Sequence, residues 1–214
     1  MRLCLLFLFL NLAALQAQAQ TSPTQSREER READARELGK ALEYFASAKY
    51  HEALLILDRL DSLYKLNPRY RAYLGVCHYY EWNYEQAIRY LEESLPHLDN
   101  FSPAERSFYY WADAESHFRL GRYQEAVPLY GKMLTLCHDN EKPDAYYRLG
   151  FCSVFEEDWS EALRYLRLSL KYYRQLRDTP DLKARIAQIT KMIRGCEEKV
   201  GRQADSIPQP APKP

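Results

Sequence analysis

The chain has 214 residues, of which 46% are apolar and only 7 are Gly, so it is long enough to build a hydrophobic core and poor in the glycines that a turn-rich β-protein needs. Its 30 basic residues are balanced by 30 acidic residues, and this neutrality argues against a nucleic-acid-binding protein, whose affinity depends on neutralising phosphates. The composition therefore favours helices, and a partner other than nucleic acid.

The first nineteen residues have the pattern of an export signal. Arg2 gives a positive start, residues 3–15 are apolar with one exception, and residues 17–19 have the small-x-small form that signal peptidase cleaves. We expect cleavage after Ala19. A retained membrane anchor is the less favoured alternative, because an anchor needs about 20 apolar residues. The mature chain is then expected to be periplasmic, cell-envelope associated or secreted, with no integral membrane segment.

Capping signals and apolar periodicity predict helices along the rest of the chain. Ser26 and Glu29 have the spacing of a capping box, as do Ser102 and Glu105, and each pair predicts the start of a helix. Asn67-Pro68 predicts the end of one helix and the start of the next. The expected helices cover about 26–47, 51–66, 103–120, 123–138, 143–156, 160–176 and 179–200, with another unit over 68–98.

The same side-chain pattern recurs four times. An aromatic residue is followed three positions later by Ala, at steps of 34, 39 and 36 residues: Tyr50/Ala53, Tyr84/Ala87, Tyr123/Ala126 and Trp159/Ala162. A small residue precedes each aromatic by nine positions: Ala41, Gly75, Ala114 and Gly150. A unit of about 34 residues with this pattern resembles the tetratricopeptide repeat, a helix-turn-helix that stacks into a solenoid.

The resemblance implies an all-α, right-handed solenoid of helical hairpins, with four repeats and a C-terminal capping helix. Small residues such as Gly75 and Gly150 should let the two helices of a hairpin approach closely. The expected segments are a signal peptide (1–19), a polar leader and start of the first helix (20–33), repeats at about 34–67, 68–101, 102–140 and 143–176, a capping helix (179–200) and a disordered Pro-rich tail (201–214).

No motif in the sequence indicates catalysis, a cofactor or a metal. The chain has neither G-x-S-x-G nor a Gly-rich phosphate loop, and its histidines lack the H-E-x-x-H spacing. His78 and His117 occupy the same place in successive units, so we expect packed core residues. Export would place the cysteines in an oxidising compartment, where Cys152 with Cys196 is the most acceptable disulfide, although buried free thiols are preferred.

In a tetratricopeptide stack the first helices of the units line a concave groove. By register, the resemblance places thirteen residues there, and the eight aromatic ones are the expected partner-binding residues: Tyr79, Tyr80, Phe108, Trp111, Phe118, Tyr147, Phe151 and Phe155. The other five are Ala72, Val76, Glu115, Arg119 and Val154. The Lys, Arg and Asn residues with which some family members hold a carboxylate are largely replaced by aromatic residues, so a carboxylate clamp is not expected.

So many rings would leave a larger apolar patch than soluble monomers tolerate, and something should cover it. The favoured hypothesis is a non-catalytic scaffold or adaptor that binds a partner peptide or helix in the groove. For exported bacterial members, the resemblance implies a role in envelope assembly or secretion. The alternative is a self-associating structural protein whose groove is filled in a homo-oligomer. The chain's own leader, tail or capping helix could also cover the groove, and a glycan stacking on Trp111 is a third possibility.

Overall fold

The computed structural model of the chain describes residues 23–177 and 179–205. The expected export signal, its cleavage site after Ala19 and residues 206–214 of the expected tail lie outside these described residues. None of the helices in the described part of the chain is long and apolar enough to cross a membrane.

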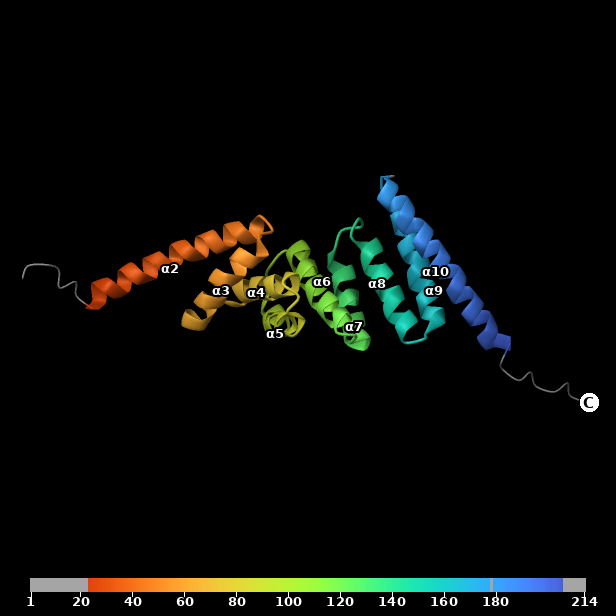
Figure 1. Cartoon of the computed structure of the whole chain (residues 1–214), viewed down its shortest axis with the longest axis horizontal. Coiled ribbons are helices and arrows are strands. Elements are labelled where there is room, and N and C mark those ends of the chain that lie inside the picture. The colour runs from red at the N-terminus through yellow and green to blue at the C-terminus, as the bar shows by residue number, and fades with distance from the viewer. Residues whose placement is uncertain (1–22, 178, 206–214) are drawn as a thin grey trace, which may run out of the picture.

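The described residues form an elongated stack of helices that follow one another in chain order from one end of the molecule to the other (Figure 1). The elements are α2 (Pro23–Ala46), α3 (Tyr50–Tyr64), α4 (Pro68–Tyr80), α5 (Tyr84–Ser94), η1 (Leu95–His97), α6 (Pro103–Arg119), α7 (Tyr123–Leu136), α8 (Lys142–Phe155), α9 (Trp159–Tyr173) and α10 (Pro180–Asp205). No strand occurs within these ranges. Consecutive helices pack as hairpins, α2 with α3, α4 with α5, α6 with α7 and α8 with α9, and α10 packs on α9. The prediction of an all-α helical solenoid is therefore confirmed.

The helix starts follow the expected capping in two places and depart from it in one. The Asn67 side chain accepts a hydrogen bond from the Tyr70 amide at 3.2 Å, and the Ser102 hydroxyl accepts one from the Glu105 amide at 3.2 Å. The prediction that the first helix starts at Ser26 is wrong, because α2 already begins at Pro23. Proline fits the first position of a helix, where a backbone N–H would be unpaired anyway. Likewise, α10 continues to residue 205 through residues that were expected to begin the tail.

Two glycines set the close approach of helices within the hairpins, as the sequence predicted. A Cβ atom added at Gly75 would lie 2.6 Å from Leu91 Cγ, and one added at Gly150 would lie 2.8 Å from Leu166 Cγ. Real Cβ atoms essentially never approach so closely, so a larger residue at either position would force the facing leucine, Leu91 or Leu166, to shift.

Each hairpin turn contains one residue with a left-handed backbone conformation, two positions before the repeated aromatic. These residues are Ala48 (φ 56°), Trp82 (φ 61°), Gly121 (φ 73°) and Glu157 (φ 57°). This feature could not be predicted from the sequence, because glycine, the residue that adopts positive φ without strain, occurs in the third turn alone. The turn geometry is therefore common to the four hairpins although its residue type is not.

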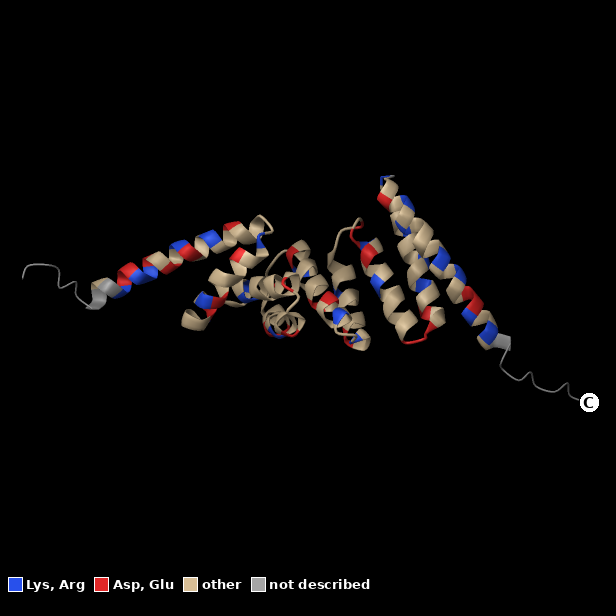
Figure 2. Cartoon of the chain, in the orientation of Figure 1, with Lys and Arg blue, Asp and Glu red and all other residues tan. Residues whose placement is uncertain are grey.

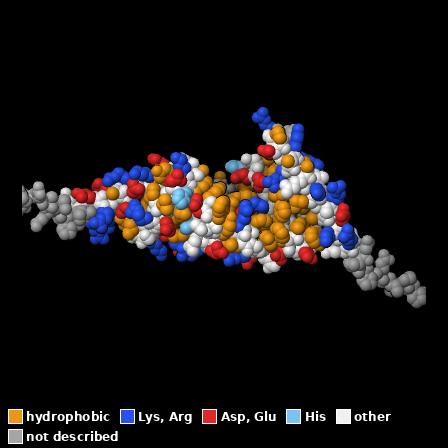
Figure 3. Space-filling model, viewed as in Figure 1, with side chains coloured by type: hydrophobic (Ala, Val, Ile, Leu, Met, Phe, Trp, Pro, Cys, Tyr) orange, Lys and Arg blue, Asp and Glu red, His pale blue; other side chains and the backbone are white. Residues whose placement is uncertain are grey.

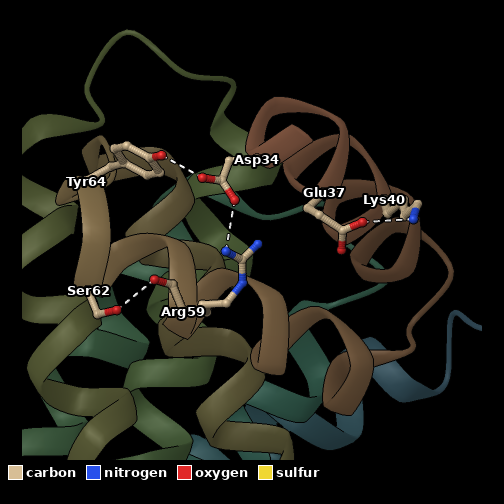
Figure 4. A network of polar contacts seen from close by, with 6 residues as sticks. All are labelled: Asp34, Glu37, Lys40, Arg59, Ser62 and Tyr64. Carbon is tan, nitrogen blue, oxygen red and sulfur yellow. Dashed lines mark hydrogen bonds and ion pairs between the residues drawn. The ribbon is translucent and has the colours of Figure 1, made fainter. Parts of the chain in front are cut away.

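At the N-terminal end, a polar network anchors α2 to α3 (Figure 4). The Asp34 carboxylate accepts a hydrogen bond from Arg59 Nη1 at 2.8 Å and another from the Tyr64 hydroxyl at 2.5 Å. These two donors lower the pKa of Asp34, so the carboxylate stays ionised. Charged residues are dense along α2 and α10, the two ends of the stack (Figure 2).

The four cysteines in the described range are free thiols, so no disulfide joins Cys152 to Cys196. Cys77 and Cys152 are buried, and burial raises the pKa of each thiol to about 12. Both thiols are therefore protonated at neutral pH and serve as small hydrophobic side chains, the reading that the sequence favoured.

Candidate functional site

The eight aromatic residues expected in the groove do not form one continuous lining. Tyr80, Phe108 and Trp111 line a pocket, Phe118, Phe151 and Phe155 form a separate aromatic surface, Tyr79 lies half-buried against Tyr80, and Tyr147 is buried. Helix α6 carries Phe108, Trp111 and Phe118 at helical spacings of three and seven, which places them on one side of the helix. The two surfaces therefore lie along the same stripe of α6.

The first surface is a pocket of about 310 Å³ between α4, α6 and α8, called the α6–α8 pocket below. Its lining is Tyr80, Phe108, Trp111, Met133, Asn140, Glu141 and Asp144. The Tyr80 ring is 41% exposed and stacks on the Tyr50 ring at 3.9 Å between centroids, and Trp111 meets Tyr130 edge to face at 5.6 Å. These contacts hold two of the lining rings in place.

The two carboxylates of the α6–α8 pocket bind neutral donors. Glu141 Oε2 accepts the His138 amide at 2.8 Å, and Asp144 Oδ1 accepts the Tyr173 hydroxyl. No ion pair involves either carboxylate within residues 23–177 and 179–205. The nearby Lys142 instead contacts Asp139, Nζ to Oδ1, at 2.6 Å. The pocket therefore combines an aromatic side with a negatively charged rim.

The second surface, called the α8 aromatic surface below, consists of Phe118, Tyr123, Phe151 and Phe155. Tyr123 and Phe155 stack at 4.5 Å, Phe118 lies 6.2 Å from Phe155, and Phe155 is 52% exposed. Arg148 covers part of this surface, with its guanidinium carbon 4.9 Å from the centre of the Phe118 ring. In the space-filling view, hydrophobic side chains gather over α8, and the surface is indented between α6 and the start of α8 (Figure 3).

Between the two surfaces lies a buried ion pair in place of the open groove that the sequence predicted. Glu115 is 1% exposed, accepts a hydrogen bond from the Tyr130 hydroxyl at 2.5 Å, and pairs with Arg148 across 2.6 Å. Burial, together with the Glu115 charge, raises the pKa of Tyr130 well above its usual value. The placement of Glu115 in the groove was therefore wrong, because a charged partner 33 residues away draws it into the core.

Tyr147 is also placed differently from the prediction. It is 4% exposed and belongs to the buried cluster that α10 completes, and the Arg185 guanidinium lies 4.5 Å from the centre of its ring. The expectation that Tyr147 lines an open groove is therefore wrong, because α10 covers this part of α8. Ala72 and Val76 are buried too, within the cluster that joins the second and third hairpins.

Sequence reasoning missed Glu141, Asp144, Tyr123 and Arg148. The two carboxylates come from the start of α8, which lies outside the helix stripe from which the groove was read. Tyr123 is the repeated aromatic of the third hairpin, and its position predicted packing at the turn without any part in an exposed surface. No sequence signal pairs Arg148 with Glu115, because the two lie on helices of different hairpins.

A second polar group lies on the other side of α6. Asp113 is fully buried, with no hydrogen-bond partner for either carboxylate oxygen, and burial raises its pKa to about 8. His117, 5% exposed, has its Nε2 3.7 Å from Asp113 Oδ1 and 3.4 Å from Glu92 Oε1, and burial lowers its pKa. The prediction of a packed His117 is confirmed. Over the described residues, no group of His, Cys, Asp and Glu is arranged to hold a metal.

Comparisons with known proteins agree with the overall fold. A family model described as Tetratricopeptide repeat matches residues 114–144. A search of curated proteins finds no match. Among solved structures, a MamA mutant is 16% identical with a TM-score of 0.62, covering 82% of this chain and 92% of that chain. A structure titled MamA AMB-1 is 14% identical with a TM-score of 0.60, covering 82% and 94%.

A third structure, titled Crystal structure of MamA protein, is 16% identical with a TM-score of 0.54 and covers 85% of this chain and 99% of that chain. At these identities the likeness concerns the fold alone. The stacked helical hairpins share the fold of these structures, and the stretch of the chain at 114–144 matches the model of the tetratricopeptide repeat.

Proposed function

We propose that this chain is a non-catalytic adaptor that binds a peptide or helix of a partner protein across the α6–α8 pocket and the α8 aromatic surface. The fold is that of a protein-protein interaction scaffold. The observation that carries the proposal is the position of two exposed aromatic surfaces on one stripe of α6. Trp111 and Phe118 are seven residues apart, a rise of about 10 Å along the helix, which an extended segment of three or four residues spans.

Exposed rings gathered in patches favour an interaction surface over incidental exposure. Large aromatic side chains bury about 150–250 Å² each when they are covered, and they dominate the energetics of interfaces. The floor between the two surfaces is fixed by the pair of Glu115 with Arg148, so a partner would meet a pre-formed surface. Pre-formed surfaces bind at a lower entropic cost.

The proposal is tested by peptide display on the mature chain, followed by calorimetry on the selected peptides. We expect Trp111→Ala and Phe155→Ala each to weaken binding about tenfold or more, because each truncation removes a central aromatic contact. Trp82→Ala is the matched control, since Trp82 is an exposed ring in the turn between α4 and α5 that lines neither surface. If Trp111→Ala and Phe155→Ala both leave the affinity and the melting temperature unchanged, the proposal is refuted.

Self-association is the second candidate, favoured by apolar exposure at the N-terminal end. Leu55, Leu63 and Tyr64 of α3 are exposed, and Leu38, Leu60 and Leu66 line a neighbouring cavity of about 360 Å³. Light scattering of the mature chain separates the candidates. A monomer at micromolar concentration removes this one, whereas a dimer that Leu63→Lys dissociates supports it. A dimer that Trp111→Ala dissociates would show that each copy of the chain fills the α6–α8 pocket of the other.

We further propose that the chain is exported and acts in the bacterial cell envelope. Support comes from the charge, apolar run and cleavage pattern of residues 1–19. Mass spectrometry of the chain purified from its native cells tests this proposal. A mature form that starts at Gln20 is the expected result, and an intact N-terminus in the cytoplasm would contradict it.

A further inference from the structure

We propose that the α6–α8 pocket takes a positively charged side chain, Lys or Arg, from the partner segment. This inference rests on the proposed function and adds the chemistry of the partner to it. The pocket provides the two elements that recognise an organic cation, which are aromatic faces and unneutralised carboxylates.

The aromatic side consists of Tyr80, Phe108 and Trp111. A Lys ammonium or Arg guanidinium within about 6 Å of a ring centre is attracted by the negative face of the ring, most strongly by Trp. The rings of Tyr80 and Trp111 are held by their stacking on Tyr50 and their edge contact with Tyr130. A bound cation would therefore find the rings already in place.

The acidic side consists of Glu141 and Asp144. Each is oriented by a neutral donor, the His138 amide and the Tyr173 hydroxyl, so each is positioned without its charge being cancelled. The nearby cations have other partners: Lys142 pairs with Asp139, and Arg185 lies over the Tyr147 ring on the α10 side. The negative rim is therefore complementary to a cation supplied by a partner.

The α8 aromatic surface has the opposite character. Its charged neighbour is Arg148, whose guanidinium already pairs with Glu115 and lies over Phe118. An apolar side chain suits this surface. The two surfaces together specify a segment that carries Lys or Arg at one position and an apolar residue about 10 Å away, three or four residues along an extended chain.

The size of the pocket agrees with a single side chain. Pockets for whole small-molecule ligands range from about 300 to 1,000 Å³, and about 310 Å³ lies at the lower end of that range. The pocket is also open at its rim, where Asn140 and Asp144 are exposed, so the backbone of the segment can remain outside.

The test uses three synthetic peptides that differ at one position. The reference is acetyl-Gly-Lys-Gly-Gly-Leu-Phe-Gly-amide, and in the others norleucine or Glu replaces Lys. Affinity for the mature chain is measured by fluorescence anisotropy at low and high salt. We expect the Lys peptide to bind about tenfold more tightly than the norleucine peptide at low salt, with the advantage shrinking at high salt, and the Glu peptide to bind least.

Variants locate the effect. Glu141→Gln and Asp144→Asn keep an oxygen that can accept the His138 and Tyr173 hydrogen bonds, so the fold should persist while the Lys advantage falls severalfold. Glu85→Gln is the matched control, because it removes one negative charge from an exposed residue of α5 that does not line the pocket. It should leave the Lys advantage unchanged.

Each outcome decides one of the two proposals. Equal binding of the Lys and norleucine peptides, with both still weakened by Trp111→Ala, overturns the cation preference and leaves the proposed function standing. Loss of the Lys advantage in Glu85→Gln, with its retention in Asp144→Asn, also overturns the assigned site. Binding by none of the three peptides overturns the inference, whereas the proposed function is then decided by the displayed peptides. A dimer that dissociates in Asp144→Asn would assign the pocket to a second copy of the chain.

Discussion

Arg148 Nε lies 2.6 Å from Glu115 Oε1, and this ion pair joins the third and fourth hairpins beneath the candidate binding surface. Glu115 also receives the Tyr130 hydroxyl, so its two oxygens bind donors from α7 and α8. The pair fixes the spacing of α6 and α8, and the same spacing sets the width of the α6–α8 pocket.

We expect Glu115→Ala to lower the free energy of unfolding by about 3 kcal/mol or more, because it leaves Arg148 largely buried without its counter-charge. Urea denaturation measures the change. The double variant Glu115→Leu with Arg148→Met should recover much of the loss, since well-packed apolar residues often replace a buried ion pair at little cost. If the double variant is as unstable as Glu115→Ala, the unpaired charge of Arg148 is not the cause of the lost stability.

Gly150 offers a sharp test of the seam between α8 and α9. Gly150→Ala should destabilise the chain by about 1–3 kcal/mol, because the new methyl group would lie 2.8 Å from Leu166 Cγ. Gly131→Ala in α7 is the matched control, because nothing lies within 4 Å of its added Cβ atom. The control should stabilise by about 0.5–1 kcal/mol through helix propensity alone. Thermal melts of both variants check the opposite signs, and like signs would contradict this account of the seam.

Asp113 should make stability depend on pH in a direction opposite to that of most carboxylates. Burial and the charge of Glu92 raise its pKa to about 8, so between about pH 4 and pH 8 the folded chain holds a proton that the unfolded chain has released. The contribution of protonated Asp113 to the free energy of unfolding is therefore fully present below about pH 4, and it is lost as the pH rises toward 8. We expect Asp113→Asn to be more stable than the original chain at pH 8 and about equal at pH 4.

Urea denaturation at the two pH values measures this difference. Asp139→Asn is the control of opposite sign, because its hydrogen bond to Lys142 lowers the pKa of Asp139, and the ionised form is the one that the fold favours. Removing that charge should lower stability at neutral pH. His117, whose pKa burial lowers, reduces stability as the pH falls below about 6.5. Because His117 Nε2 lies 3.7 Å from Asp113 Oδ1, the comparison is made in a His117→Gln background as well, where His117 no longer titrates. A gain for Asp113→Asn that is the same at both pH values would contradict the titration.

The left-handed turn residues predict a stabilising change. Ala48 has φ 56°, a conformation that costs about 1–2 kcal/mol for a residue with a Cβ atom and little for glycine. We expect Ala48→Gly to stabilise the chain by up to about 1 kcal/mol in a thermal melt. Ser47→Gly, one residue earlier and outside the positive-φ region, should instead destabilise by about 0.5–1 kcal/mol. Destabilisation by both changes would show that the turn carries no strain.

The sequence by itself determined the repeated hairpins. Gly75, Gly150 and the aromatic-Ala pairs recur because each hairpin solves the same local packing problem, and local constraints leave a periodic trace in the chain. The stripe of α6 from Phe108 to Phe118 followed from helix geometry in the same way. Turn strain left no trace, because Ala48, Trp82 and Glu157 are not the residues that positive φ usually selects.

Tertiary structure alone decided which of the residues expected to line a groove stay exposed and what surrounds them. Tyr147 is buried because α10 returns over it, and Glu115 is buried because Arg148 reaches it from the next hairpin. Glu141 and Asp144 join Trp111 because the start of α8 lies beside α6. Such contacts join residues of different hairpins, and no periodicity within one repeat specifies them, because burial and pairing depend on which surfaces the stacking brings together.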